Sequence, residues 1–456
     1  MKPSESPTEL IGRRDALQLA LLRPWQPAPG AFDRAAATHL FARAGFGASR
    51  DVVDRAVADG FDRAIGLALA ADESDEILRA GIGKLLPTGE IAPLQAWWVA
   101  LVLHGGAPLR ERVALMWHGH FATSFDKVQD SRMMHAQNAL LREHGLGDFR
   151  ALLHKVARDP AMLVWLDGNE NQRGRPNENF AREVLELFAL GIGNYGEHDV
   201  REAARAFTGF GTSGRSFVFR AALHDGGSKS VLGRTGTFGG DEVLDVVLAH
   251  PAAPRHVARV LLRELVEPVP SDAAIDETAV VLVANEWHIG RTIETIVRSE
   301  LFFSPAARRS RIAGPVELVA RAVRMLDAHV APRDAAQAAE HMGQALFRPP
   351  SVKGWDGHRA WINAGAWIAR HNFLAGLARA HVEKTDRTQV NLRAAFGEPQ
   401  VREQVAEVVL SVLLPGVDAP ELATRVRSVA NESADVDHAL ADATALVLTS
   451  PEFQLC

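Results

Sequence analysis

Apolar residues recur at helical spacing along most of this chain, so the pattern predicts a mainly α-helical protein. Glycine or proline interrupts the repeat where one helix would end and the next would begin. The first half is expected to hold helices over residues 33–47, 49–72 (broken at Gly60), 93–106, 109–121, 130–144, 148–158, 178–193 and 197–210. The second half is expected to hold helices over residues 241–250, 253–266, 272–286, 290–303, 315–328, 332–346, 360–382, 400–412, 419–431 and 435–449.

The pattern changes between residues 215 and 242, where Gly, Ser and Thr are frequent. Phe217 and Phe219 alternate with Val218 and Arg220, and the sequence DGGS that follows is typical of a turn. We therefore predict one small β-hairpin insertion near residues 215–240 in an otherwise mainly α-helical, large multi-helix fold. Residues 31–456 would form a single large helical domain, with any sub-boundary near residues 211–240.

The first 30 residues are rich in proline and serine and are expected to form a tail. Arg13 and Arg14 precede a short apolar run that ends at Leu22, which is similar to a twin-arginine export signal. Because Arg23-Pro24 interrupts the run, the same segment also reads as a disordered tail with one short helix. The location stays open: periplasm or envelope if the signal works, and cytoplasm otherwise.

Composition narrows the class of protein. Of the 456 residues, 47% are apolar and 23% are charged, which is ordinary for a globular protein. No segment approaches the roughly 20 apolar residues that a membrane-spanning helix needs. The net charge of −6 argues against a nucleic-acid partner, which requires a basic face. The single cysteine, Cys456, excludes a disulfide within the chain and a thiolate zinc site.

Two histidines stand in the segment LMWHGHFATSFDKV, residues 115–128. On a helix that turns about 100° per residue, His120 shares an apolar face with Met116 and Trp117, whereas His118 points elsewhere and is expected to be half-exposed. Two interpretations of His120 stay open. It is either a neutral core histidine bonded to a carbonyl group, or a metal ligand or general base.

The neighbouring polar residues extend this candidate site. His135 lies on the next helix and would converge with His120 if the two helices are antiparallel, as their short connection favours. Asp126 and Lys127 would cap or pair locally, an interaction that contributes little at a surface.

A second candidate lies on the helix in RPNENFAREVLELFALGIG, residues 175–193. Asn179, Arg182, Glu183 and Glu186 share its polar arc, and the two carboxylates at i and i+3 can reach one point. Close carboxylates with a histidine nearby suit a divalent metal ion or general acid–base chemistry. The alternative is a solvated face with Glu178 and Arg182 as an i, i+4 ion pair.

Two polar loops offer side chains for a substrate. His224 and Asp225 open the sequence HDGGSKSVLG, whose glycines and Lys229 could cradle an anion but lack the spacing of a nucleotide-binding loop. Lys353, Trp355 and Asp356 lie in SVKGWDGHRAWIN, where tryptophans beside charged residues are typical of a carbohydrate surface. The alternative for these tryptophans is anchorage of the loop to the core.

Long stretches of the chain resemble the bacterial domain-of-unknown-function 1800 family, from about residue 35 to about residue 450. The stretches that carry the resemblance are HLFARAGFGAS (39–49), MWHGHFATSFDKV (116–128), FRALLHKVARDPAMLVWLDGNENQRGRPNENFAREVLELFALGIGNYGEHDVREAARAFTGF (149–210), HDGGSKSVLGRTG (224–236) and FRPPSVKGWDGHRAWINAGAWIARHNF (347–373). The family pattern matches at His120, Asp126, Lys127, His135, Asn177, Glu178, Asn179, Arg182, Glu183, Glu186, His224, Asp225, Lys353, Trp355 and Asp356.

The resemblance implies little about chemistry, because the family has no established activity to transfer. Its members are often secreted, and their genes commonly neighbour those of a sulfatase-like family exported by the twin-arginine route. This implies an envelope or periplasmic setting and an exported sulfatase-like partner protein.

Two hypotheses follow. In the first, the chain is a metal-dependent enzyme of the cell envelope, a hydrolase acting on a glycan-like substrate. The metal ligands would be His120, His135, Glu183 and Glu186. The catalytic groups would be His120, Asp126, Arg182, Glu183 and Glu186. The substrate would bind to His224, Asp225, Lys353, Trp355 and Asp356. In the second, the chain is a non-catalytic helical scaffold that binds or matures the exported partner. A space between His120 and the carboxylates would favour the enzyme, and a closed, fully bonded network would favour the scaffold.

Overall fold

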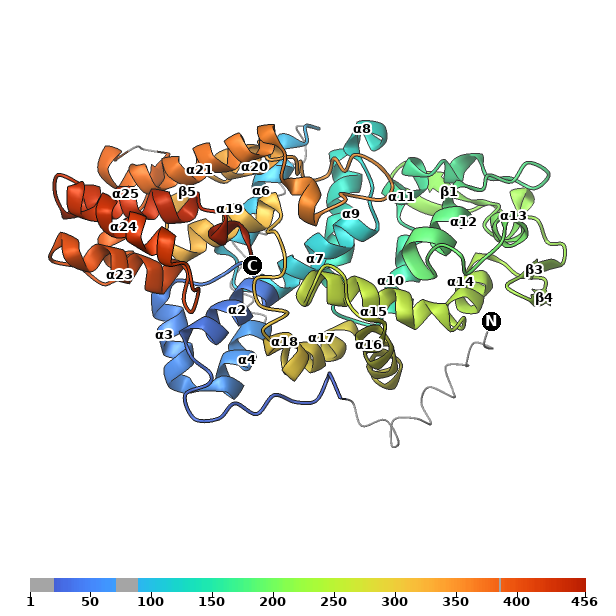
Figure 1. Cartoon of the computed structure of the whole chain (residues 1–456). Helices are drawn as coiled ribbons and strands as arrows, with labels where there is room; N and C mark the ends of the chain where they lie inside the picture. Colours follow the sequence, from blue (N-terminus) through green and yellow to red (C-terminus); the bar gives the residue numbers. More distant parts are fainter. Residues whose placement is uncertain (1–19, 71–88, 385–386) are drawn as a thin grey trace.

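The computed structural model of this chain describes residues 20–70, 89–384 and 387–456, and in these residues the predicted mainly α-helical fold is confirmed (Figure 1). Almost every predicted helix is present. Helix starts follow local capping chemistry: the side chains of Asp130, Asp148 and Asp159 each accept a hydrogen bond from the first turn of the helix that follows. Among the described helices, none is long and apolar enough to cross a membrane.

Buried apolar side chains form two separate clusters, and the first is built mainly from the chain before residue 308. Its helices surround the aromatic residues Trp117, Phe121, Phe149 and Phe188. They are α2 (Arg34–Ala44), α3 (Arg50–Asp59), α4 (Phe61–Leu69), α10 (Phe149–Val156), α11 (Pro160–Trp165), α12 (Asn179–Glu183), the turn η3 (Val184–Ala189), α13 (Glu197–Ala206), α14 (Gly240–Leu248), α15 (Ala252–Leu265), α16 (Asp272–Ala284), α17 (Ile289–Val297) and α18 (Glu300–Phe303).

The second cluster joins a few early helices to the end of the chain. Its helices are α6 (Ala92–His104), α8 (Phe125–Val128), α9 (Ser131–His144), α19 (Pro315–Met325), α20 (Pro332–His341), α21 (Ala364–Glu383), α22 (Leu392–Phe396), α23 (Arg402–Leu413), α24 (Pro420–Glu432) and α25 (Val436–Leu448). Figure 1 shows α19 to α25 together at one end of the molecule and α11 to α14 at the other.

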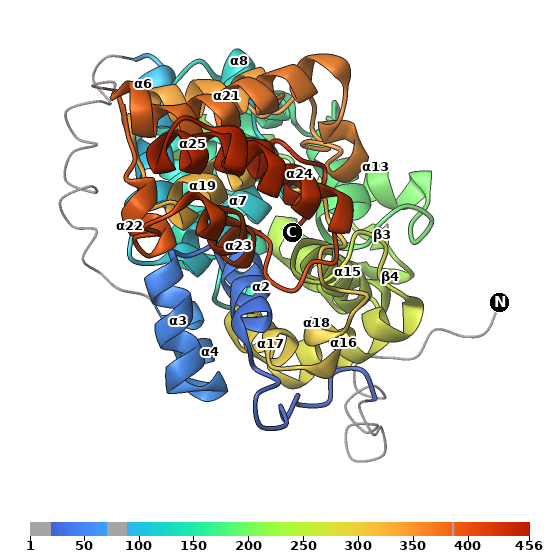
Figure 2. The same cartoon turned by 60° about the vertical axis from the view of Figure 1, so that its left-hand side comes forward.

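Helix α7 (Pro108–His120) lies where the two clusters meet. Its Val113 and Trp117 belong to the first cluster, while Ala114, between them in sequence, belongs to the second. In both Figure 1 and Figure 2, α7 runs through the middle of the molecule between α19 and α15. A helix in this position is covered on more than one side, so it lacks the single apolar stripe of a surface helix.

The β structure is richer than the single predicted hairpin. In the described residues β1 (Phe210–Ser213) pairs with β2 (Ser216–Phe219), and β3 (Lys229–Val231) pairs with β4 (Arg234–Gly236). A third short pair joins β5 (His329–Val330) to β6 (Thr388–Gln389). The DGGS sequence connects the first two pairs and is not itself a hairpin turn.

The described part of the predicted tail packs on the helical body. Backbone amides of Leu21 and Leu22 donate to the carboxylate of Glu277, and the ring of Trp25 stacks on Phe303 with a centroid distance of 4.2 Å. The twin arginines lie outside the described residues.

Candidate functional site

The helix that carries Glu183 and Glu186 contains a π-helical turn, η3. Turns of this kind are rare in proteins, and those that occur are often found at functional sites. Gly191, at φ +84°, ends it, and the amides of Leu190 and Gly191 both donate to the carbonyl of Leu185. The carbonyls of Leu187 and Phe188 lie among the last four of this helix, which have no partner within it, so they can accept from other donors.

Two histidines from different helices supply those donors. His120, at the end of α7, donates from Nε2 to the carbonyl of Phe188 over 3.0 Å, and His256 on α15 donates from Nε2 to the carbonyl of Leu187 over 2.7 Å. Their ring centroids are 5.8 Å apart. Burial, followed by the charge of His256, lowers the pKa of His120 to about 3, so its ring is neutral. His120 is thus a neutral histidine bonded to a carbonyl group, and its Nδ1 is left as an acceptor.

The two carboxylates of the helix are close to each other. Burial and the charge of Glu186 raise the pKa of Glu183, while Arg182 and Lys353 oppose that rise. Glu186 accepts a hydrogen bond from the hydroxyl of Tyr195 over 2.6 Å, and burial together with this carboxylate raises the pKa of Tyr195 to about 12. The two carboxylates therefore lie close enough for their charges to interact, and Tyr195, which the sequence reasoning did not place there, bonds to one of them.

The prediction that His118 is half-exposed is wrong. Its side chain is only 1% exposed, Nε2 accepts a hydrogen bond from the amide of Phe347, and burial lowers its pKa to about 3. Its ring packs against those of Trp98 and Trp355. The cause is the position of α7 between two cores, since both sides of the helix are covered.

The structure does not bring the four predicted metal ligands together. His120 uses Nε2 on a backbone carbonyl, and His135 packs against Trp97, with a centroid distance of 5.3 Å. Within residues 20–70, 89–384 and 387–456, no group of three or more His, Cys, Asp or Glu side chains could hold a metal ion. The described side chains therefore do not assemble the predicted metal site.

Asp126 and Lys127 do not pair with each other. Asp126 is exposed and accepts from Arg348 over 2.9 Å, while Lys127 lies 2.7 Å from Asp167. Asp167 also accepts from the amide group of Asn179 over 3.2 Å. These pairs fasten α8 and α12 to neighbouring loops, and neither is part of the cavity described below.

Arg182 and the loop pair His224 and Asp225 also form local ion pairs and hydrogen bonds. Arg182 contacts Glu178 over 3.0 Å, the predicted i, i+4 pair, and Glu197 over 2.8 Å. Asp225 accepts from Arg205, and this bond together with the amide of Gly227 lowers the pKa of the carboxyl to about 2, against the opposing effect of burial. His224 bonds to the carbonyl of Thr208. His224 and Asp225 hold the β3–β4 region against α13, and no contact joins them to Lys353 within the described part of the chain.

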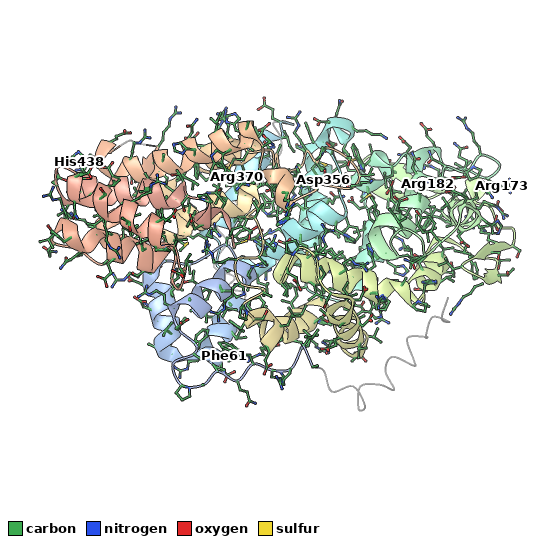
Figure 3. The ribbon with its side chains drawn as sticks, in the orientation of Figure 1. Phe61, Arg173, Arg182, Asp356, Arg370 and His438 are labelled. Atoms are coloured by element: carbon green, nitrogen blue, oxygen red, sulfur yellow. The ribbon has the colours of Figure 1, made fainter. Side chains whose placement is uncertain are left out.

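A cavity of about 260 Å³ at the junction of the two cores gathers the other predicted residues. It lies between α7, α15, the segment before α19 and the loop before α21. Four of the predicted site residues line it: His120, Lys353, Trp355 and Asp356. The remaining lining residues are Arg112, Leu115, Met116, Gly119, Val260, Arg263, Glu264, Pro268, Arg311, Ile312, Gly314, Glu317, Gln344, Gly357, His358 and Trp361. In the view of Figure 3, Asp356 lies near the middle of the molecule, between Arg370 and Arg182.

Buried ion pairs form one wall of this cavity. Arg112 on α7 lies 2.9 Å from Glu264 on α15 and 2.8 Å from Glu317 on α19, so it links elements of both cores. Arg311 lies 3.3 Å from Glu264 and 3.5 Å from Glu317. Burial alone would raise the pKa of Glu317, but the charges of Arg112 and Arg311 hold it well below its usual range.

The loop carrying Lys353, Trp355 and Asp356 docks on α7 through its backbone. Gly354 has a φ of +74°, and a Cβ atom there would lie 2.2 Å from the carbonyl oxygen of Gly119. Only glycine permits this approach. A Cβ atom on Gly119 itself would meet nothing within 4 Å.

Sequence reasoning missed the charged wall. Arg112 precedes Met116 and His120 at successive i+4 spacings on α7, so helical spacing could have placed it on the cavity side. Glu264, Arg311 and Glu317 carry no such signal, because only the tertiary packing of the two cores brings them to α7. A larger cavity, about 520 Å³, between α2–α4 and the ends of α6 and α19 contains none of the predicted site residues.

Comparison with known proteins gives a family and no activity. No curated protein and no solved structure matches the chain. The family model described as "Protein of unknown function (DUF1800)" matches residues 39–455, nearly the whole length. The resemblance seen in the sequence is thereby confirmed, and the chain belongs to the DUF1800 family of proteins of unknown function.

Proposed function

We propose that this protein is an enzyme that binds a glycan-like substrate in the cavity between its two cores. The observation that carries the proposal is the convergence of His120, Lys353, Trp355 and Asp356 on one cavity. Ligand sites favour such junctions, and they combine apolar walls with a few polar groups that fix orientation.

The lining suits the two faces of a sugar ring. Trp355 and Trp361 offer flat apolar surfaces, and the charged groups around them can bond to hydroxyls. A volume of about 260 Å³ is slightly below the roughly 300–1,000 Å³ of pockets for drug-sized ligands. A cavity of this size would hold a single sugar unit or the end of a longer chain.

Asp356 is the side chain best suited to general acid–base work. Glu264 and Glu317 each contact arginines, whereas no ion pair to Asp356 is present among the described residues. Asp356 is exposed at the cavity, where it can exchange protons with water and substrate. Neutral His120 adds an acceptor at Nδ1. Lys353 and Arg263 would orient the substrate.

A metal-dependent form of this function needs ligands beyond those that the described residues assemble. Mass spectrometry of metals in the purified protein tests it directly. Near-stoichiometric metal in the wild type that disappears in Glu183→Ala and His120→Ala would restore the predicted ligand set. Metal that persists in both variants, or none after growth in supplemented medium, would remove that set from the proposal.

The alternative function is a non-catalytic scaffold that binds or matures an exported sulfatase-like partner. One observation favours it: His120, His256 and Glu186 each have a hydrogen-bond partner within the protein, as a purely structural network would. The open cavity favours the enzyme, because a scaffold has no need to leave charged groups around an empty space.

Filling the cavity tests the proposal. Gly119→Leu projects a side chain into the cavity from a helical position without a close neighbour, and Gly376→Leu makes the same change on α21, where a Cβ atom also meets nothing within 4 Å. We expect Gly119→Leu to weaken binding of oligosaccharides, measured by ligand-observed NMR, at least about tenfold, and Gly376→Leu to leave it unchanged. Equal binding by both variants would place the ligand elsewhere.

A further inference from the structure

The inner wall of the central cavity contains guanidinium groups with unused donors. Arg112 is 1% exposed; its Nε and Nη1 lie beside Glu264 and Glu317, but its Nη2 is buried and has no hydrogen-bond partner among the described residues. Nη1 of Arg311, 3.5 Å from Glu317, is also buried without a hydrogen bond. Buried donors without a partner are unusual in folded proteins, because each forfeits its hydration.

The charges that line the cavity are not balanced. Four cations line it (Arg112, Arg263, Arg311 and Lys353) against three carboxylates (Glu264, Glu317 and Asp356), an excess of one positive charge. Two of the cations, Arg263 and Lys353, are exposed at the cavity and have no ion pair among the described residues, although the charge of Lys353 also acts on Glu183 outside the lining. A single negative group would therefore neutralise the lining.

A neutral histidine adds a directed donor to the same space. Nδ1 of His358 faces the amide of Ile312 at 3.4 Å, so Nδ1 is the acceptor and the proton resides on Nε2. Burial, followed by the charges of Arg359, Arg311 and Arg263, lowers the pKa of His358, which keeps the ring in this neutral form. His358 can thus donate to an oxygen without adding charge.

We propose that the central cavity is specific for an acidic ligand, whose carboxylate or other oxyanion lies against Nη2 of Arg112 with Arg263 and Lys353 around it. Guanidinium groups bind oxyanions through charge-assisted hydrogen bonds, which are about twice as strong as neutral ones. This inference rests on the proposed function, because it identifies the substrate class as an acidic sugar. An uncharged sugar would leave the buried donors unpaired.

The test compares hexoses that differ only at carbon 6: glucose, glucuronate, glucose 6-phosphate and glucose 6-sulfate. Isothermal titration or NMR gives the Kd of each, and we expect the acidic members to bind about tenfold more tightly than glucose at low salt, with the preference falling as salt rises. The order among the three acids identifies a carboxylate, phosphate or sulfate as the preferred group. Equal Kd values for glucose and all three acids would overturn the inference.

Two variants locate the anion. Arg112→Lys keeps a cation beside Glu264 and Glu317 but removes Nη2, and we expect it to abolish most of the preference for acid over glucose. Lys353→Gln should reduce that preference about threefold, whereas Lys155→Gln, the same charge change on the exposed side of α10, should not alter it. If Arg112→Lys does not fold, the Lys353 and Lys155 pair decides the question. An unchanged preference in Lys353→Gln would then refute the proposed position.

Failure of the inference is distinguishable from failure of the proposed function. If Gly119→Leu blocks glucose and the acids alike and the wild type shows no acid preference, only the acidic specificity falls. If hexoses still bind to Gly119→Leu, or if no member of the series binds to the wild type, both the proposed function and the acidic specificity are refuted. If inorganic phosphate and sulfate bind but do not compete with glucuronate, the anion occupies another place and the inference is refuted.

Discussion

The contact between Gly354 and Gly119 is the structural feature on which the proposed site depends most directly. Gly354→Ala would place a Cβ atom 2.2 Å from a carbonyl oxygen, where about 3.4 Å is the shortest ordinary contact. The two backbones must therefore separate by roughly 3.4 − 2.2 = 1.2 Å. Since both atoms belong to main chains, no rotation of a side chain can relieve the clash.

Two terms contribute to the expected loss of stability. A positive φ costs about 1 kcal/mol for a residue with a Cβ atom, and overpacking of a well-fitted contact costs about 1–3 kcal/mol. Gly357→Ala is the matched control, because Gly357 has the same φ of +74° but its nearest neighbour would be 3.9 Å away. The control measures the cost of the positive φ alone. The difference in free energy of unfolding between the two variants therefore measures the contact between the loop and α7.

The assay is urea unfolding followed by tryptophan fluorescence, combined with oligosaccharide binding. We expect Gly354→Ala to lose about 2–4 kcal/mol and Gly357→Ala about 1 kcal/mol. Gly354→Ala should also weaken binding at least about tenfold, because Lys353, Trp355 and Asp356 move away from α7 together. Equal losses of stability in the two variants, or unchanged binding in Gly354→Ala, would refute this account of the loop.

Three further predictions concern the interior. Burial raises the pKa of Asp159 to about 6, so its buried charge destabilises the fold increasingly as pH rises from about 4 to 6. In urea titrations the free energy of unfolding of Asp159→Asn should match that of the wild type below pH 4 and exceed it by about 3 kcal/mol above pH 6. A difference independent of pH would contradict this prediction. Glu317→Gln should lower the free energy of unfolding by about 3–5 kcal/mol, because two buried arginines lose a carboxylate. Glu340→Gln, at an exposed ion pair, should lower it by under about 1 kcal/mol. Similar losses of stability in the two variants would show that the buried network is not critical. His120→Phe should cost about 1–3 kcal/mol by leaving the carbonyl of Phe188 without a donor, and an unchanged denaturation midpoint would argue against this bond.

Local chemistry explains why the helices could be predicted so closely. The helix expected over residues 130–144 begins at Ser131 because Asp130 accepts from two backbone amides, a signal visible in the sequence. The expected helix 290–303 is instead divided into α17 and α18, because Ser299 caps a new turn by accepting from the amide of Phe302. Ser299 is a capping residue that is also visible in the sequence.

The side chains of α7 were harder to place, since periodicity assumes one buried face. His120 was correctly assigned to the inner side, but His118 was expected on an open side that the second core in fact covers. No pattern within α7 reveals that a loop more than two hundred residues later will close over it, as the bond from the amide of Phe347 shows.

The candidate site shows the same contrast between residues of one segment and residues of distant segments. Residues within one segment can be related from the sequence: helix geometry fixes the separation of Glu183 and Glu186, and the charge of Glu186 acts on Glu183. Groups from distant segments could not be combined: His135 was expected beside His120, and α9 instead turns it toward Trp97. Sequence reasoning proposed Lys353, Trp355 and Asp356 as substrate-binding residues, but it did not indicate that His120 and Arg112 line the same cavity.

The π-helical turn relates these observations to one another. The carbonyls of Leu187 and Phe188 belong to the last turn of the helix, where carbonyls have no partner within the helix, and they accept from His256 of α15 and His120 of α7. These two helices also supply Glu264 and Arg112 to the cavity wall, so the hydrogen bonds on the turn fix the spacing of α7 and α15 on which the ion pair depends. Glu183 and Glu186 thus lie on the element that positions the cavity, and their helix acts on the site through its backbone.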